Sequence, residues 1–310
     1  MSRALAVGLA AACLGLVHGA RGATLQWETH APLPVPRSEV AAARVGDEIV
    51  VLGGFLADGG TSNRVDAYSP ARDAWRRLQD LPVAVNHAMA VGAGGRLYAF
   101  GGYTADGVPL RSAHVLQGAR WRALPRMPFP RAAAGVGFAG GRIVVAGGVG
   151  AGRRLARNAL VYDLRRRRWS VVVGPTPREH LGVASLGGTV YAVGGRTAGL
   201  DTNLLHFESF RPGERAWRRL PPVPDPRGGT GAAGLAGEIV SVGGEEPGGT
   251  IGLVLAYRVA ERRWTQLRDL PTPRHGLGVV AFGGRVFAIG GGPEPGLTVS
   301  SANEALPIVP

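Results

Sequence analysis

The chain has 310 residues, of which 45% are hydrophobic, 50 are glycine and 23 are proline. This balance excludes a disordered chain and suits an all-β protein with many turns. The formal net charge is +13, and all 35 basic residues are arginine. The absence of lysine excludes Schiff-base chemistry. No internal stretch of about 18 residues is continuously apolar, so we expect no membrane span.

The arginines are spread along the whole chain instead of forming one stripe or block. We therefore expect no nucleic-acid partner. Two explanations of the basic charge stay open. One is a compositional bias of the genome, which the abundant alanine and glycine favour. The other is selection for an anionic partner.

Residues 1–22 are predicted to be a secretory signal peptide, cleaved between Ala20 and Ala23. A basic start at Arg3 precedes an apolar run over residues 4–17. The alternative is a buried first helix. The single cysteine, Cys13, lies in this segment, so the mature chain has no disulfide and no thiolate metal ligand. We expect a secreted or periplasmic protein.

Beyond this segment the chain repeats itself six times. Glycine pairs that close an apolar run recur every 46 to 49 residues, starting at Gly53, Gly101, Gly147, Gly194, Gly243 and Gly290. The tryptophans recur every 46 to 48 residues, at Trp27, Trp75, Trp121, Trp169, Trp217 and Trp264. A repeat of this length predicts structural units that stack or are arranged radially.

Each unit is predicted to contain four short antiparallel strands. In the second unit they fall at residues 87–93, 96–100, 111–117 and 120–124, separated by glycine-rich or polar turns. The glycine pair allows backbones to approach closely, and the tryptophan can cover the gap between neighbouring sheets. In four units an aromatic residue stands seven positions before the tryptophan: Tyr68, Tyr162, Phe210 and Tyr257.

These repeats resemble the kelch motif, in which an apolar strand, a glycine pair, an aromatic residue and a tryptophan follow at fixed spacing. The resemblance covers about residues 25–305 in six copies. It implies an all-β fold, a six-bladed kelch β-propeller with four antiparallel strands per blade, and we expect residues 24–310 to form this single domain. The second unit departs from the motif, with Leu116 near the aromatic position.

The last blade is predicted to be completed by the start of the domain. Trp27 precedes the first full set of strands, and no tryptophan follows Gly290. Residues 25–29 are therefore expected to supply the fourth strand, beside a third strand around residues 297–304. Closure of this kind removes an exposed sheet edge.

Five Pro-Arg pairs recur 16 residues before a glycine pair, with the arginines at Arg37, Arg131, Arg178, Arg227 and Arg274. Equivalent positions of a ring converge around its axis, so we predict that these arginines bind an acidic ligand at one channel mouth. The alternative also stays open: each guanidinium caps backbone carbonyls or pairs with an acid of the next blade.

The residues next to these arginines, and those directly after the glycine pairs, differ between units. We predict that the ligand-binding set also includes His87, Tyr103, Arg196, Glu245 and His275, with Phe55 as a second aromatic platform beside Tyr103. If the protein is an enzyme, Glu39, Glu179 and His180 are the candidate acid–base residues. A solvated polar rim is the alternative. The three histidines have no short ligand spacing, so no metal site is predicted.

Two functions are consistent with these features. The first is an exported, non-catalytic recognition propeller that binds an acidic glycan or an acidic protein segment. The second follows from a similarity to exported bacterial kelch proteins such as N-acetylneuraminate epimerases, and is acid–base catalysis of sugar mutarotation or epimerisation, with Glu39 or Glu179 as the base. We expect a monomer without a cofactor.

Overall fold

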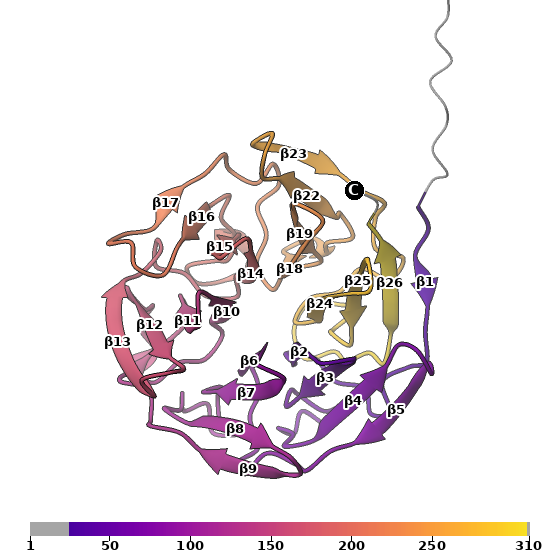
Figure 1. Ribbon diagram of the computed structural model, residues 1–310. Coiled ribbons are helices and arrows are strands. Elements are labelled where there is room, and N and C mark those ends of the chain that lie inside the picture. Colours follow the sequence, from indigo (N-terminus) through magenta and orange to yellow (C-terminus); the bar gives the residue numbers. More distant parts are fainter. Residues whose placement is uncertain (1–24, 309–310) are drawn as a thin grey trace, which may run out of the picture.

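Six four-stranded antiparallel sheets surround a central axis in the computed structural model, which describes residues 25–308 (Figure 1). The predicted signal peptide lies outside the described residues. Within them, helical structure is limited to two short 3₁₀ turns, η1 (Ala151–Arg153) and η2 (Leu200–Thr202). No helix of residues 25–308 has the length and apolar character needed to span a bilayer. The predicted all-β propeller of six blades is confirmed.

Five blades are built from strands that follow one another along the chain. Blade 1 contains β2 (Ala41–Val45), β3 (Glu48–Leu52), β4 (Val65–Ser69) and β5 (Ala74–Arg77). Blade 2 contains β6 (Met89–Ala93), β7 (Arg96–Phe100), β8 (Ala113–Gln117) and β9 (Arg120–Ala123). Blade 3 contains β10 (Gly135–Ala139), β11 (Arg142–Ala146), β12 (Asn158–Asp163) and β13 (Arg168–Val173).

Blade 4 contains β14 (Gly182–Leu186), β15 (Thr189–Val193), β16 (Phe207–Phe210) and β17 (Arg218–Arg219). Blade 5 contains β18 (Gly231–Leu235), β19 (Glu238–Val242), β22 (Leu255–Arg258) and β23 (Arg263–Gln266), and a small hairpin of β20 (Glu245–Glu246) and β21 (Gly249–Thr250) extends from it. Blade 6 combines β24 (Gly278–Phe282), β25 (Arg285–Ile289) and β26 (Asn303–Pro307) with β1 (Glu28–Thr29).

The strand β1 closes the ring, as predicted. Glu28 pairs with Ala305 and Thr29 with Glu304, so the first strand becomes the outer strand of the last blade. Trp27 donates its indole N–H to the Arg268 carbonyl, 3.0 Å away. The expected third strand at residues 297–304 was placed too early: β26 begins at Asn303, because the residues before it form the loop at the channel mouth.

The repeated aromatic residues hold neighbouring blades together. Within a blade, the tryptophan lies opposite the aromatic residue of the third strand, as in the Tyr68–Trp75 and Tyr162–Trp169 pairs. The indole N–H then donates to a backbone carbonyl about 42 to 44 residues earlier in four blades, at Ala31, Gln79, Pro125 and Pro221. The repeat of about 47 residues therefore reflects one contact that is made at successive blade boundaries.

The glycine pairs mark the place where one blade meets the next. Gly53 has a φ of 66°, and a Cβ at this position would lie 2.5 Å from the Val85 carbonyl oxygen of the following blade segment. The N–H of Gly54 donates to the same carbonyl at 2.9 Å. Only glycine tolerates both the positive φ and this approach, which explains why the pair recurs in every unit.

Candidate functional site

Two loops from each blade meet at one end of the channel. They are the segment before the first strand and the segment after the second strand, and an antiparallel bridge joins them in every blade: Ser38–Phe55, Asn86–Tyr103, Ala132–Val149, Glu179–Arg196, Gly228–Glu245 and His275–Gly292. The residues that differ between units therefore share one face, as the sequence predicts. We call this face the mouth face.

Six equivalent residues form the innermost ring of the mouth face: Glu39, His87, Ala133, His180, Gly229 and Gly276. All six have a positive φ, between 50° and 69°. From the second to the sixth, each N–H donates to the carbonyl of the preceding member at 2.9 to 3.1 Å. A left-handed conformation is unfavourable for side chains other than glycine, so the hydrogen-bonded ring fixes the backbone that carries the three polar members.

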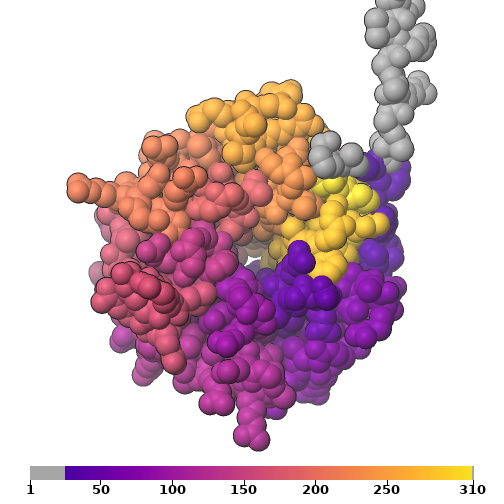
Figure 2. All heavy atoms as spheres, in the orientation of Figure 1, coloured from indigo at the N-terminus to yellow at the C-terminus, as the bar shows by residue number. Residues whose placement is uncertain are grey.

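The ring surrounds the end of a central channel. Figure 2 shows the opening at the centre of the molecule. A cavity of about 150 Å³ at this end is lined by the six ring residues and by the small side chains that start the first strands, such as Ala41, Ala90 and Ala232. The cavity therefore has a polar rim and an apolar wall.

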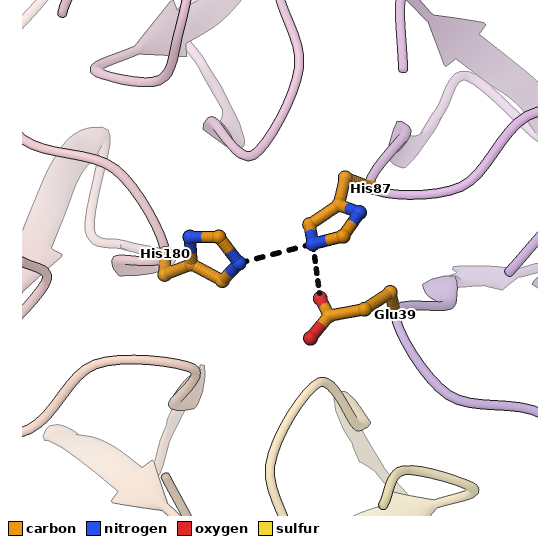
Figure 3. A group of neighbouring side chains, drawn as sticks. All are labelled: Glu39, His87 and His180. Carbon is orange, nitrogen blue, oxygen red and sulfur yellow. Dashed lines mark hydrogen bonds and ion pairs between the residues drawn. The ribbon is translucent and has the colours of Figure 1, made fainter. Parts of the chain in front are cut away.

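Glu39, His87 and His180 converge at this rim although they come from blades 1, 2 and 4 (Figure 3). Nε2 of His87 lies 3.2 Å from Oε2 of Glu39 and 3.0 Å from Nε2 of His180. Nδ1 of His180 lies 3.4 Å from Oε1 of Glu179. Blade 3 places Ala133 between the two histidines, and its small side chain lets the imidazoles meet across that blade.

Four more contacts close these side chains into a circuit. Nδ1 of His275 lies 3.2 Å from Oε1 of Glu39 and 3.6 Å from Oε1 of Glu245. Arg196 bridges two carboxylates, with Nη1 2.7 Å from Glu245 and Nε 3.6 Å from Glu179. We call the complete set the mouth circuit: Glu39, His87, His180, Glu179, Arg196, Glu245 and His275.

Burial and neighbouring charges set the protonation of the circuit. Burial opposes the charge of Glu39, but the surrounding imidazoles, first His87, outweigh it and hold the pKa of Glu39 well below its usual range. Burial lowers the pKa of His87 to about 4. Burial also disfavours charge on His275 and Glu179, yet Glu39 raises the pKa of His275 and His180 lowers that of Glu179. The rim thus combines anionic carboxylates with an unprotonated imidazole at neutral pH.

The two aromatic residues of the predicted set flank His87. The ring centroids of Phe55 and Tyr103 lie 5.7 and 5.5 Å from that of His87, both in edge-on orientation. Both residues are half-buried, and burial raises the pKa of Tyr103 to about 12. Their rings support the histidine at its position in the circuit.

The five arginines predicted to encircle the channel are placed inside the blades. Four of them have no exposed surface and the fifth is 3% exposed: Arg37, Arg178, Arg227, Arg274 and Arg131. Arg37 pairs with Asp66 and Arg274 with Glu304, each at 2.6 Å, and both also donate to carbonyls of their own blade. The predicted ring of ligand-binding guanidinium groups around the channel is therefore wrong. Arg37, Arg178 and Arg274 pair with an acid of their own blade instead of the next, Arg227 pairs with Asp225, and Arg131 donates to Pro130 and Asn158.

Two features of the mouth face were not predicted from the sequence. Asn86 is buried, and its Oδ1 lies 2.7 Å from Nδ1 of His87. In blade 3, the loop after the second strand carries three exposed arginines, Arg153, Arg154 and Arg157, and none of them forms an ion pair with a residue in the range 25–308. The sequence signal was the run of arginines at a loop position where the other units have at most one.

Comparisons with known proteins agree with the geometry. Residues 121–291 match the family model described as the KLHDC2/KLHL20/DRC7 Kelch-repeats domain, and residues 36–82 match the Kelch motif. The chain is 33% identical to human Kelch-like protein 34 over 109 residues, which cover 33% of this chain and 17% of that protein. It is 45% identical to human Kelch-like protein 4 over 51 residues, 16% of this chain and 7% of that protein. The chain thus matches less than a fifth of the length of these relatives.

Proposed function

Because the chain belongs to the kelch-repeat family, whose propellers typically bind proteins, we propose that it is a recognition propeller for an acidic protein segment. The segment lies across the mouth face, over blade 3. We further propose that the protein acts after export, since residues 1–22 have the pattern of a signal peptide.

One observation supports the acidic partner: the exposed arginines of blade 3 have no acidic partner among the described residues, whereas the arginines in the corresponding loops of other blades are held by protein groups. Arg64 pairs with Asp66, Arg196 pairs with Glu245, and Arg111 donates to the Met127 carbonyl. Arg153 also lies near the blade 2 loop that follows Tyr103, since its Nη1 would lie 3.7 Å from a Cβ at Gly107. Two exposed guanidinium groups on adjoining loop residues are a suitable surface for a carboxylate-bearing segment.

The test uses a fluorescent peptide rich in Asp and Glu and measures its polarisation with the purified protein. Reversing two charges, Arg153→Glu with Arg154→Glu, is expected to weaken binding roughly tenfold or more, because charge complementarity is lost. Wild-type affinity should also fall as salt rises. A matched control, Arg165→Glu with Arg168→Glu, makes the same charge change at the β12–β13 turn on the opposite face.

Equal losses in the two double variants would show that net charge alone governs binding. The same affinity in wild type and in the Arg153/Arg154 variant would remove the proposed site. Tighter binding of a sialylated glycan than of the peptide would support the mouth face as the binding site but would show that the ligand is an acidic glycan instead of an acidic protein segment.

A sugar mutarotase or epimerase is the second candidate, and the buried carboxylate–imidazole contacts of Glu39 favour it. NMR of sialic acid anomer exchange, recorded with and without the protein, separates the two functions. Acceleration that disappears in Glu39→Gln or Glu179→Gln identifies an enzyme. If the rate of anomer exchange with the protein equals the rate in buffer alone, the enzyme hypothesis is rejected and the recognition function is retained.

A further inference from the structure

The three polar residues at the rim present lone pairs to one point. Asn86 donates its amide N–H to Thr61, so its Oδ1 faces Nδ1 of His87 at 2.7 Å and favours the tautomer protonated there. Glu179 Oε1 lies on the same side of His180, 3.4 Å from its Nδ1; this contact is electrostatic, because Nδ1 of His180 has no hydrogen-bond partner among the described residues. With both Nδ1 atoms protonated, the two Nε2 atoms and Oε2 of Glu39 face one another as three acceptors without a proton between them.

In this tautomeric state, a cation between the three atoms relieves the repulsion of their lone pairs. The side chains of Glu39, His87 and His180 are only 11%, 12% and 9% exposed, so water replaces few of the missing partners. Buried polar atoms without partners destabilise a fold. Outer-sphere acceptors on the non-ligating nitrogen are also what metal-bound histidines usually have.

The distances suit a transition metal. Zn²⁺ holds histidine nitrogens and carboxylate oxygens at about 2.0–2.2 Å, so its ligand atoms lie about 3.3–3.6 Å apart in a tetrahedron. Here Nε2 of His87 is 3.0 Å and 3.2 Å from its two partners, and all three donor atoms lie within 4.8 Å of one another. The His87–His180 and His87–Glu39 atom pairs would have to move apart by only a few tenths of an ångström to reach the ligand separations of a tetrahedral zinc site.

The neighbouring group of Glu39, Glu245 and His275 has a different role. Nε2 of His275 lies 3.1 Å from the Glu294 carbonyl oxygen, and Nδ1 lies 3.2 Å from Oε1 of Glu39. Both nitrogens thus face oxygen acceptors and both act as donors, which leaves His275 no lone pair for a metal. His275 thus binds Oε1 of Glu39, and Oε2 of the same carboxylate remains available as a metal ligand.

We propose that Glu39, His87 and His180 bind one divalent transition-metal ion of the zinc type. The ion has three protein ligands, and its remaining position opens toward the channel cavity of about 150 Å³. The hydrogen-bonded ring that fixes the backbone of all three residues preorganises the site. Asn86, Glu179 and His275 orient the ligands from outside. This site is independent of the proposed recognition of an acidic segment.

The experiment titrates ZnCl₂ into the chelator-treated, dialysed protein by isothermal calorimetry. We expect one Zn²⁺ per chain and no comparable binding of Mg²⁺, which prefers oxygen ligands. Glu39→Gln, His87→Asn and His180→Asn should each weaken Zn²⁺ binding at least tenfold. Asparagine is chosen because it tolerates the left-handed backbone at both histidine positions. The matched control is His206→Asn, a histidine that lies outside the mouth circuit.

Thermal unfolding without metal separates ligand loss from misfolding. The variants should melt close to wild type in chelator, whereas Zn²⁺ should raise the Tm of wild type and of His206→Asn only. Absence of Zn²⁺ binding to the wild-type protein overturns the proposal. So does an affinity that is unchanged in folded Glu39→Gln, His87→Asn and His180→Asn, because Zn²⁺ is then held elsewhere.

Discussion

Replacing Arg178 by alanine is expected to destabilise the protein by about 3–5 kcal/mol, since a buried carboxylate loses its partner. Arg178 has no exposed surface and forms an ion pair with Glu208, which is 5% exposed. It also donates to the carbonyls of Gly194, Thr176 and Ala192. Alanine leaves these acceptors buried and unpaired, which costs stability. Burial lowers the pKa of the Arg178 guanidinium, which is a further sign that this group lies away from solvent.

For a domain of this size the loss corresponds to a fall in Tm of roughly 6–20 °C. Differential scanning calorimetry measures it, with the exposed Arg165→Ala as control. The double variant Arg178→Met with Glu208→Leu removes both charges and should recover most of the stability. If Arg178→Ala melts within about 1 °C of wild type, the guanidinium is not buried in the blade. The same contacts mean that a substitution at Arg178 disrupts blade 4 before it affects any ligand on the mouth face.

The fold could be predicted from the sequence because the same contacts recur in each unit. The tryptophan bonds to the preceding blade in five of the six units, at similar spacing, and the glycine pair allows the next blade's backbone to approach. A contact that recurs leaves a period in the sequence. The closing strand was predictable for the same reason, since Trp27 keeps the spacing although its own blade lies at the other end of the chain.

The role of the arginines was not predictable from their own spacing. A period along the chain gives the place of Arg37 or Arg274 in the ring but not the direction of its side chain. A second pattern did carry that information. Asp66, Glu208 and Glu304 follow their arginines by 29 or 30 residues, on the third strand of the same blade. An acid at a fixed distance in three units indicates an ion pair within the blade.

The mouth circuit was predictable as a set of residues but not as a set of contacts. Its members were found because they differ between units that otherwise repeat. Their pairing depends on side chains that cross the axis: His87 meets His180 from 93 residues away, past a blade that contributes only Ala133. The absence of a short ligand spacing therefore said little about a metal site, since a ring brings donors together from separate blades.

Loss of the closing strand is expected to have the other large effect. Compare a chain that starts at Leu25 with one that starts at His30. The shorter chain lacks the β1–β26 pairing, the ion pair of Glu28 with Arg285 at 2.9 Å and the packing of Trp27 on the core between blades 5 and 6. Removing a fully buried tryptophan costs about 3–5 kcal/mol. Because Trp27 is half-buried, we expect its loss together with the lost strand pairing and ion pair to reach this range, so the Tm should fall by roughly 6–20 °C.

The shorter chain should also associate, because β26 then presents an unpaired edge to solvent. Size-exclusion chromatography with light scattering measures this, alongside the thermal melt. Trp27→Ala in the longer chain separates the two contributions: it removes the packing but keeps the strand, so it should lower the Tm without association. Equal melting of the chains that start at Leu25 and His30 contradicts the closure, because the shorter chain has an unpaired edge at β26 and lacks the contacts of Trp27 with blade 5.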